Sequence, residues 1–210
     1  MNEHFPNVEQ ANELITWAEN QNPGKWIRHS YNVANAAKII SQKANMDNKF
    51  AYVLGLLHDI GRYEGETSIR HVYAGYSLMK NKGYNDAAKI CLTHSFPYKN
   101  ILAFVGDMDC TKDELEYMEN ELEKTEYDDY DKLIQLCDAL GSHDGICLLE
   151  VRWIDVIRRR GVNKYLKEKF NKTFEIKDYF DRRCGMSIYK LFKDEITKNI
   201  FGDNSGLNST

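Results

Sequence analysis

Apolar residues along most of this chain recur every three or four positions, which is the spacing of one face of an α-helix. Between residues 25 and 44, for example, Val33, Ala37 and Ile40 fall on the same face. The chain contains only three prolines, so few positions would interrupt such helices. We therefore predict an all-α fold, with helices near residues 9–19, 25–44, 48–59, 69–82, 85–94, 131–140, 147–159 and 179–201.

The stretches between these helices contain no internal repeat and no convincing linker. A chain of 210 residues is long enough to bury a substantial core as one unit. We expect a single domain over residues 1–210, with a core of about 25–140 and a C-terminal helical extension of about 145–201. Residues 202–210 have the composition of a frayed tail.

Composition and charge exclude several classes of protein. A net charge of −4 argues against a general nucleic-acid binder, which needs a basic surface. No apolar run approaches the roughly 20 residues of a membrane span, and the first residues do not resemble a signal peptide. The five cysteines form no Cys-x-x-Cys pair and their number is odd, so we expect reduced thiols and a cytoplasmic protein.

Two stretches are strongly charged. Residues 107–131 are acidic, which predicts a solvent-exposed helix and loop; a functional acidic patch is the alternative. Residues 158–172 are basic and begin with Arg158, Arg159 and Arg160. They predict a charged outer face, or else one or two guanidinium groups that steer a phosphorylated substrate.

The most informative segment is 55–62, where an apolar helix ends in His58 and Asp59. Neighbouring helical residues point about 100° apart, so both side chains reach one site only where the backbone leaves the helix. We expect Gly61 to provide that exit, because glycine tolerates the positive φ of a helix C-terminus. The sequence thus predicts an imidazole and a carboxylate at the end of a buried helix.

Further candidate ligands lie at other helix ends. His29, His71 and His94 each lie near the end of a predicted helix, and Asp138 interrupts an apolar helical stripe. A buried carboxylate needs a cation or dense hydrogen bonding, and an arginine such as Arg28 or Arg152 could serve instead of a metal. Mixed nitrogen and oxygen ligands suit one or two divalent ions, with Fe, Mn, Co, Ni, Zn or Mg as candidates.

The order of His29, then His58-Asp59, then Asp138 resembles the HD-domain superfamily of metal-dependent phosphohydrolases, and His58-Asp59-Ile60-Gly61 resembles its HDIG variant. The resemblance covers about residues 25–140 and implies an HD-domain helical bundle. By this resemblance His29, His58, Asp59 and Asp138 would hold one ion. Asp59 would bridge to a second ion, which His71 and His94 complete.

The resemblance also implies an activity: metal-activated water would cleave a phosphoester or phosphoanhydride of a nucleotide or a similar small phosphorylated metabolite. Asp59 would act on the attacking water, and Arg62 would bind a phosphate oxygen, although Arg62 could instead pair with Glu64 or Glu66. A di-iron HD-type oxygenase acting on a small polyol and a non-catalytic metal-binding sensor stay open as alternatives. The expected partner is the small phosphorylated substrate, with a second copy of the chain as a further candidate.

Overall fold

A computed structural model describes residues 5–202 of the chain, and most of this range is α-helical. The all-α prediction is therefore confirmed. The helices are α1 (Val8–Gln21), α2 (Lys25–Lys43), α3 (Asn48–Leu57), α4 (Arg70–Asn81), α5 (Asn85–Thr93), α6 (Lys112–Lys124), α7 (Asp129–Leu140), α8 (Leu149–Arg160), α9 (Leu166–Cys184), α10 (Ile188–Leu191) and α11 (Lys193–Phe201). Two 3₁₀ turns, η1 (Ile60–Glu64) and η2 (Ile101–Ala103), and a short antiparallel hairpin, β1 (Gly141–Ser142) and β2 (Gly145–Ile146), complete the described part.

Helices α2 and α3 form the centre of the molecule and pack closely against each other. A Cβ atom at Gly55 would lie 2.8 Å from the Cα of Ala34, so a glycine on α3 and an alanine on α2 permit this approach. The Asp47 side chain accepts hydrogen bonds from the backbone N–H groups of Lys49 and Phe50, which starts α3 at this point. The pair holds the N-terminal part of α2 beside the C-terminal end of α3.

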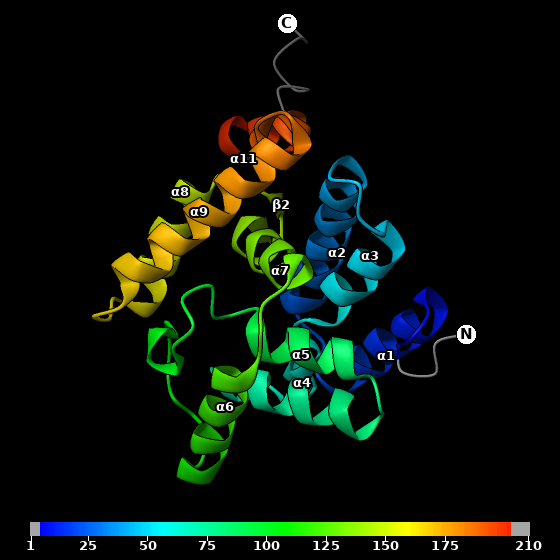
Figure 1. Cartoon of the computed structure of the whole chain (residues 1–210), viewed down its shortest axis with the longest axis vertical. Helices are drawn as coiled ribbons and strands as arrows, with labels where there is room; N and C mark the ends of the chain where they lie inside the picture. Colours follow the sequence, from blue (N-terminus) through cyan, green and yellow to red (C-terminus); the bar gives the residue numbers. More distant parts are fainter. Residues whose placement is uncertain (1–4, 203–210) are drawn as a thin grey trace, which may run out of the picture.

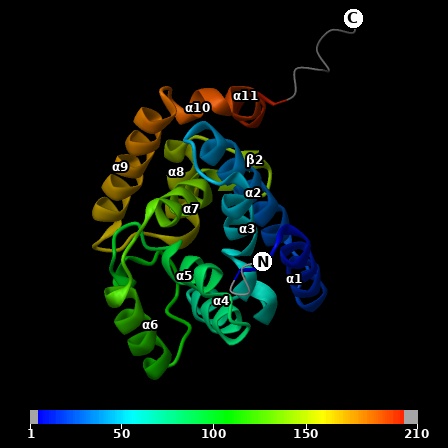
Figure 2. The ribbon, with the colours of Figure 1, turned by 45° about the vertical axis from the view of Figure 1, so that its right-hand side comes forward.

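Two hydrophobic clusters share these central helices. One cluster joins α2 and α3 to α1, α4, α5 and α6, and the other joins them to α7 and the C-terminal helices. Figures 1 and 2 show α9 along one edge of the molecule, outside α7, with α10 and α11 continuing across the top. Trp153 of α8 stacks on Phe170 of α9, so these two helices cover α7 together.

The C-terminal region differs from the sequence-based expectation. The last predicted helix, 179–201, is three helices, and the first of them begins at Leu166, inside the basic stretch. Helix α9 ends because Gly185 adopts a left-handed conformation with φ of 67°, which glycine allows without strain. The buried positions Ile176, Phe180 and Cys184 recur every four residues and face the core.

The acidic segment 107–131 also needs a correction at its end. Most of it is exposed as expected, but Asp131 is completely buried. Its carboxylate accepts a hydrogen bond of 2.7 Å from the Thr93 hydroxyl and pairs with the Lys89 ammonium at 2.6 Å. Asp131 also completes the capping box that starts α7, so it links α5 to α7.

Two further sequence-based statements concern the chain as a whole. None of the helices within residues 5–202 has the length and apolar character needed to cross a membrane. The expected tail, 202–210, lies outside the described residues except for Gly202.

Candidate metal centre

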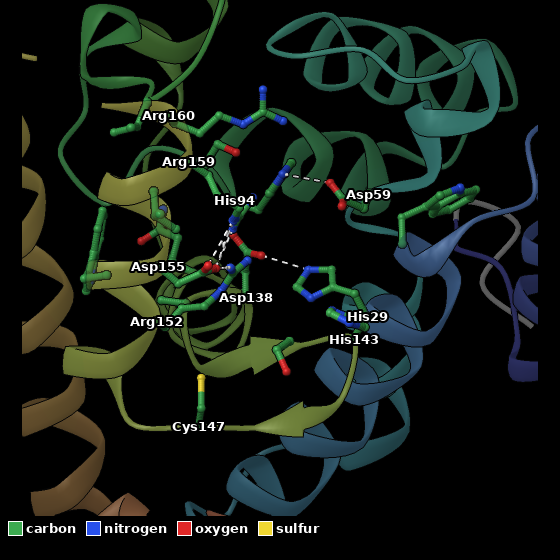
Figure 3. A pocket seen from close by; sticks show the side chains of 18 of the residues that line it. His29, Asp59, His94, Asp138, His143, Cys147, Arg152, Asp155, Arg159 and Arg160 are labelled. Atoms are coloured by element: carbon green, nitrogen blue, oxygen red, sulfur yellow. Dashed lines mark hydrogen bonds and ion pairs between the residues drawn. The ribbon is translucent and has the colours of Figure 1, made fainter. Parts of the chain in front are cut away.

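Three predicted ligands from α2, α3 and α7 meet in one group. The Nε2 atom of His29 lies 3.0 Å from Oδ1 of Asp138 and 3.2 Å from Nε2 of His58. Nε2 of His58 lies 3.7 Å from the same Asp138 oxygen. Figure 3 shows the side chains of His29 and Asp138 pointing toward each other, joined by a dashed line. Residues that are 109 positions apart in sequence thus place their polar atoms around one point.

The other three predicted ligands form a second group next to the first. Oδ1 of Asp59 lies 3.2 Å from Nε2 of His71 and 3.5 Å from Nε2 of His94, and these two nitrogens are 3.3 Å apart. All three residues are buried. His71 comes from the first turn of α4, and His94 follows the last residue of α5.

Asp59 stands between the two groups. While its Oδ1 faces His71 and His94, its Oδ2 lies 3.9 Å from Nε2 of His58 in the first group. Arg62 Nε donates a hydrogen bond of 2.6 Å to the same Oδ2. Arg62 therefore pairs with Asp59 and not with Glu64, whose carboxylate accepts a hydrogen bond from Arg70.

Backbone carbonyls orient three of the four imidazoles. Nδ1 of His58 lies 2.7 Å from the carbonyl oxygen of Gly55, and Nδ1 of His94 lies 2.9 Å from that of Cys91. Nδ1 of His71 makes the same kind of contact with the carbonyl of Ser68. Because a carbonyl oxygen only accepts, Nδ1 of each ring carries a proton, which leaves Nε2 as the atom of the neutral ring that can bind a cation. This is the arrangement that metal-binding histidines need.

The turn after α3 depends on Gly61, but for a different reason from the one expected. Its φ is not positive. Instead, a Cβ atom at this position would lie 2.0 Å from the carbonyl oxygen of His71 and 2.4 Å from the backbone nitrogen of Gly75. The absence of a side chain lets η1 touch the backbone of α4, which brings Asp59 to His71.

The electrostatic environment keeps both carboxylates ionised. Burial by itself would raise the pKa of Asp59, but the adjacent Arg62 guanidinium outweighs burial and holds this pKa well below its usual value. For Asp138 the effect of burial is likewise outweighed, here by His29 and His58, and its pKa is also well below the usual value. Burial lowers the pKa of His71 to about 3, so this imidazole is neutral and able to bind a cation.

The donor atoms fit a divalent ion. Ligands that share an ion at about 2.1 Å lie about 3.0 Å apart in octahedral and about 3.4 Å apart in tetrahedral geometry. The shortest contacts in the two groups, 3.0 to 3.3 Å, fall in this range. Paired Nε2 lone pairs at such distances repel each other unless a proton or a metal ion lies between them. Each of the two groups could therefore hold a metal ion.

The comparison with known protein families agrees with this geometry. The HD domain matches residues 26–142, which is more than half of the chain and runs from α2 to β1. The chain belongs to the HD domain family. Neither the curated proteins nor the solved structures contain a significant match. The helical bundle with two buried His/Asp groups is consistent with the metal-dependent phosphohydrolases of this family.

A single pocket of about 780 Å³ opens onto both groups of the HD domain. This volume is typical of sites for small molecules. Its lining includes five of the six candidate ligands, together with Arg62; His58 lies behind them and is completely buried. Arg28 and Arg152, the alternative partners for Asp138, pair instead with Asp144 and Asp155.

The pocket also contains residues that sequence reasoning did not single out. Gln135 lies on α7, three positions before Asp138, and is almost completely buried. Its Nε2 donates to the carbonyl of Thr93, whereas its Oε1 has no hydrogen-bond partner among the described residues. The spacing of three residues could have identified it, because residues i and i+3 share a helix face. Others come from α8 and α9, beyond the HD match, and include Trp153 and Lys169.

Proposed function

We propose that this HD-domain protein is a metal-dependent phosphohydrolase that cleaves a phosphoester or phosphoanhydride of a nucleotide or a similar small phosphorylated metabolite. The observation that supports the proposal most directly is the location of two buried His/Asp groups at the base of one pocket. His29, His58 and Asp138 would hold one ion, and Asp59, His71 and His94 the other. The cationic side chains in the same pocket favour a phosphorylated substrate over a neutral polyol.

In the proposed hydrolysis, the metal ions and the surrounding residues would have different roles. When bound, divalent ions would supply a water whose pKa is lowered from near 16 to about 7 and would offset phosphate charge. Asp59 would orient the attacking water or take its proton, while the hydrogen bond from Arg62 fixes its Oδ2. Arg62 Nη2 has no hydrogen-bond partner within residues 5–202, so it can donate to a phosphate oxygen in the pocket.

The deciding experiment combines metal analysis with an activity screen. The purified protein is analysed for Fe, Mn, Co, Ni, Zn and Mg, and phosphate release is then measured on mononucleotides, cyclic nucleotides and dinucleoside polyphosphates with each ion. Oxygen consumption is recorded in the same reactions. Metal-dependent phosphate release without oxygen uptake supports the proposal. Oxygen uptake without phosphate release would favour the oxygenase, and metal without either reaction would favour the sensor.

Removal of the metal should lower thermal stability. At a free ion concentration about 100-fold above the dissociation constant, bound metal stabilises the folded state by about 2.7 kcal/mol. For a chain of this length, that corresponds to a Tm decrease of roughly 5 to 10 °C after chelation. Differential scanning fluorimetry with and without EDTA measures the change, and re-addition of the ion should reverse it. An identical Tm in both conditions would contradict the metal assignment.

Arg62→Gln should impair the site without unfolding the protein. The variant loses the charged donor to Asp59 Oδ2, and loss of such a supporting group typically reduces metal affinity or activity about 10- to 100-fold. Metal content and kcat/KM measure the effect. Arg28→Gln is the matched control, because Arg28 is exposed and lies 3.9 Å from Asp144 at the surface. Equal activities of the two variants would show that Arg62 has no role at the centre.

A further inference from the structure

The pocket has a second side that the HD domain does not build. Helices α8 and α9 lie beyond residue 142 and contribute Arg152, Arg159, Arg160 and Lys169 to its lining. In Figure 3 the three arginines lie on the opposite side of the pocket from His29 and Asp59. We call these four residues the cationic wall. A substrate that fills the pocket therefore meets both the candidate metal groups and the cationic wall.

The wall has more positive charge than its neighbours neutralise. Asp155 is the single acidic residue that α8 and α9 contribute to the described pocket lining. Its carboxylate pairs with Arg152 at 3.0 Å and with Arg159 at 2.7 Å. Arg160 and Lys169 form no direct ion pair with a carboxylate among residues 5–202, although both line the pocket, and the nearest charge that acts on Lys169 is the carboxylate of Asp138. Two cations without a direct ion pair thus face the space where a substrate would lie.

Lys169 is held in place by apolar surroundings. Its Nζ lies 5.9 Å from the ring centres of both Phe104 and Trp153, where the ring faces attract a cation. Burial lowers the pKa of Lys169 to about 8, so the side chain is still mostly protonated at neutral pH. A partly desolvated ammonium binds an anion more strongly than an exposed one does.

An unused hydrogen-bond donor lies in the same part of the pocket. The Nε1–H of Trp153 is buried and has no acceptor among the described residues, and Trp153 itself lines the pocket. Buried donors without an acceptor are rare because desolvation costs free energy that no hydrogen bond returns. Because the protein covers this nitrogen, an oxyanion beside Lys169 would accept its hydrogen bond only after a small shift of the indole ring. The wall therefore combines unpaired positive charge with an unpaired donor.

We propose that the cationic wall is a second anion subsite, in which Lys169 and Arg160 bind a phosphate of the substrate other than the one that is cleaved. This inference rests on the proposed phosphohydrolase function and narrows it. The substrate then has at least two phosphates, one at the candidate metal groups and one at α8 and α9. A nucleotide with a single phosphate would use only half of the pocket.

Two neutral variants test the subsite. Lys169→Met keeps an unbranched apolar side chain against Trp153, and Arg160→Gln keeps a polar one at the end of α8. The matched control is Arg158→Gln, on the same helix but outside the pocket lining. The substrates are adenosine 3′,5′-bisphosphate and adenosine 5′-monophosphate, which differ by one phosphate. Loss of a charged hydrogen bond should raise KM for the bisphosphate about 10-fold or more in both variants, with kcat little changed.

Comparing KM for the two substrates distinguishes loss of phosphate binding at the subsite from a general loss of activity. KM for the monophosphate should stay within about twofold of wild type, and Arg160→Lys should restore most of the preference for the bisphosphate because it keeps the charge. Arg158→Gln should behave as wild type on both substrates. An equal rise in KM for both substrates, or no rise for either, would overturn the proposed subsite.

A binding measurement keeps the test independent of turnover. Inorganic pyrophosphate is titrated calorimetrically into the metal-loaded full chain and its variants. Pyrophosphate that binds to the metal ions does so equally in every variant. An affinity that is weaker only in Lys169→Met and Arg160→Gln therefore measures binding to the cationic wall. If no substrate is hydrolysed but this difference is found, the phosphohydrolase proposal fails and the anion subsite stands. Unchanged affinity in both variants would refute the subsite.

Discussion

His58→Ala should lose bound metal and phosphate release together. His58 is completely buried, and its Nε2 lies 3.2 Å from His29 and 3.9 Å from Asp59, so it contacts both candidate groups. Without a metal-activated water, the rate should fall by a factor on the order of 1000 or more. Elemental analysis and phosphate release, measured on the same preparation, test the expectation.

His143→Ala is the matched control for metal content. His143 also lines the pocket, but it pairs with Asp144 at 3.0 Å and belongs to neither group. This variant should retain as much metal as the wild type, which distinguishes loss of a ligand from loss of any histidine. A metal-free His58→Ala protein that released phosphate at the original rate would refute the assignment.

Gly61→Ala should have the largest effect on folding. The added methyl group would lie 2.0 Å from the His71 carbonyl oxygen and 2.4 Å from the Gly75 nitrogen, and both are backbone atoms that cannot rotate away. Relief requires η1 and α4 to separate, at a cost of about 3 kcal/mol or more. The Tm should fall by roughly 6 to 12 °C. Metal affinity should fall as well, because α4 carries His71 away from Asp59.

Gly75→Ala tests the same interface with the same chemical change. Its nearest neighbours, the Cβ and Sγ atoms of Cys91 and the nitrogen of Gly61, would lie 3.2 Å away, which small shifts can relieve. Alanine also favours a helix interior by about 1 kcal/mol over glycine, so the net loss should stay within about 1 kcal/mol. Thermal and urea unfolding of both variants provide the comparison. Similar losses would show that close approach at Gly61 is not the decisive constraint.

Local patterns predicted the helical core well because they report on one face of one helix. The periodicity of α2, α3 and α7 placed apolar residues on the buried side. The same reasoning missed the first part of α9, before residue 179, where charged residues surround the buried positions and conceal the repeat that Ile176 begins. It also placed Asp131 in solvent, because nothing near it in sequence indicates that Lys89 and Thr93 lie within contact.

The types and order of the candidate ligands are a property of the sequence, because imidazoles and carboxylates at helix ends are visible in the chain itself. Their division into two groups around Asp59 was decided by the tertiary structure, since α2, α4, α5 and α7 must pack before these side chains meet. The tertiary structure also decided why residue 61 must be glycine: the backbone of α4 leaves no room for a side chain, whereas the sequence had suggested a positive φ. It likewise decided that α8 and α9 line the same pocket as the candidate metal groups. The physical reason is that periodicity fixes which way a side chain faces on its own helix, whereas the distance between helices depends on every contact between them.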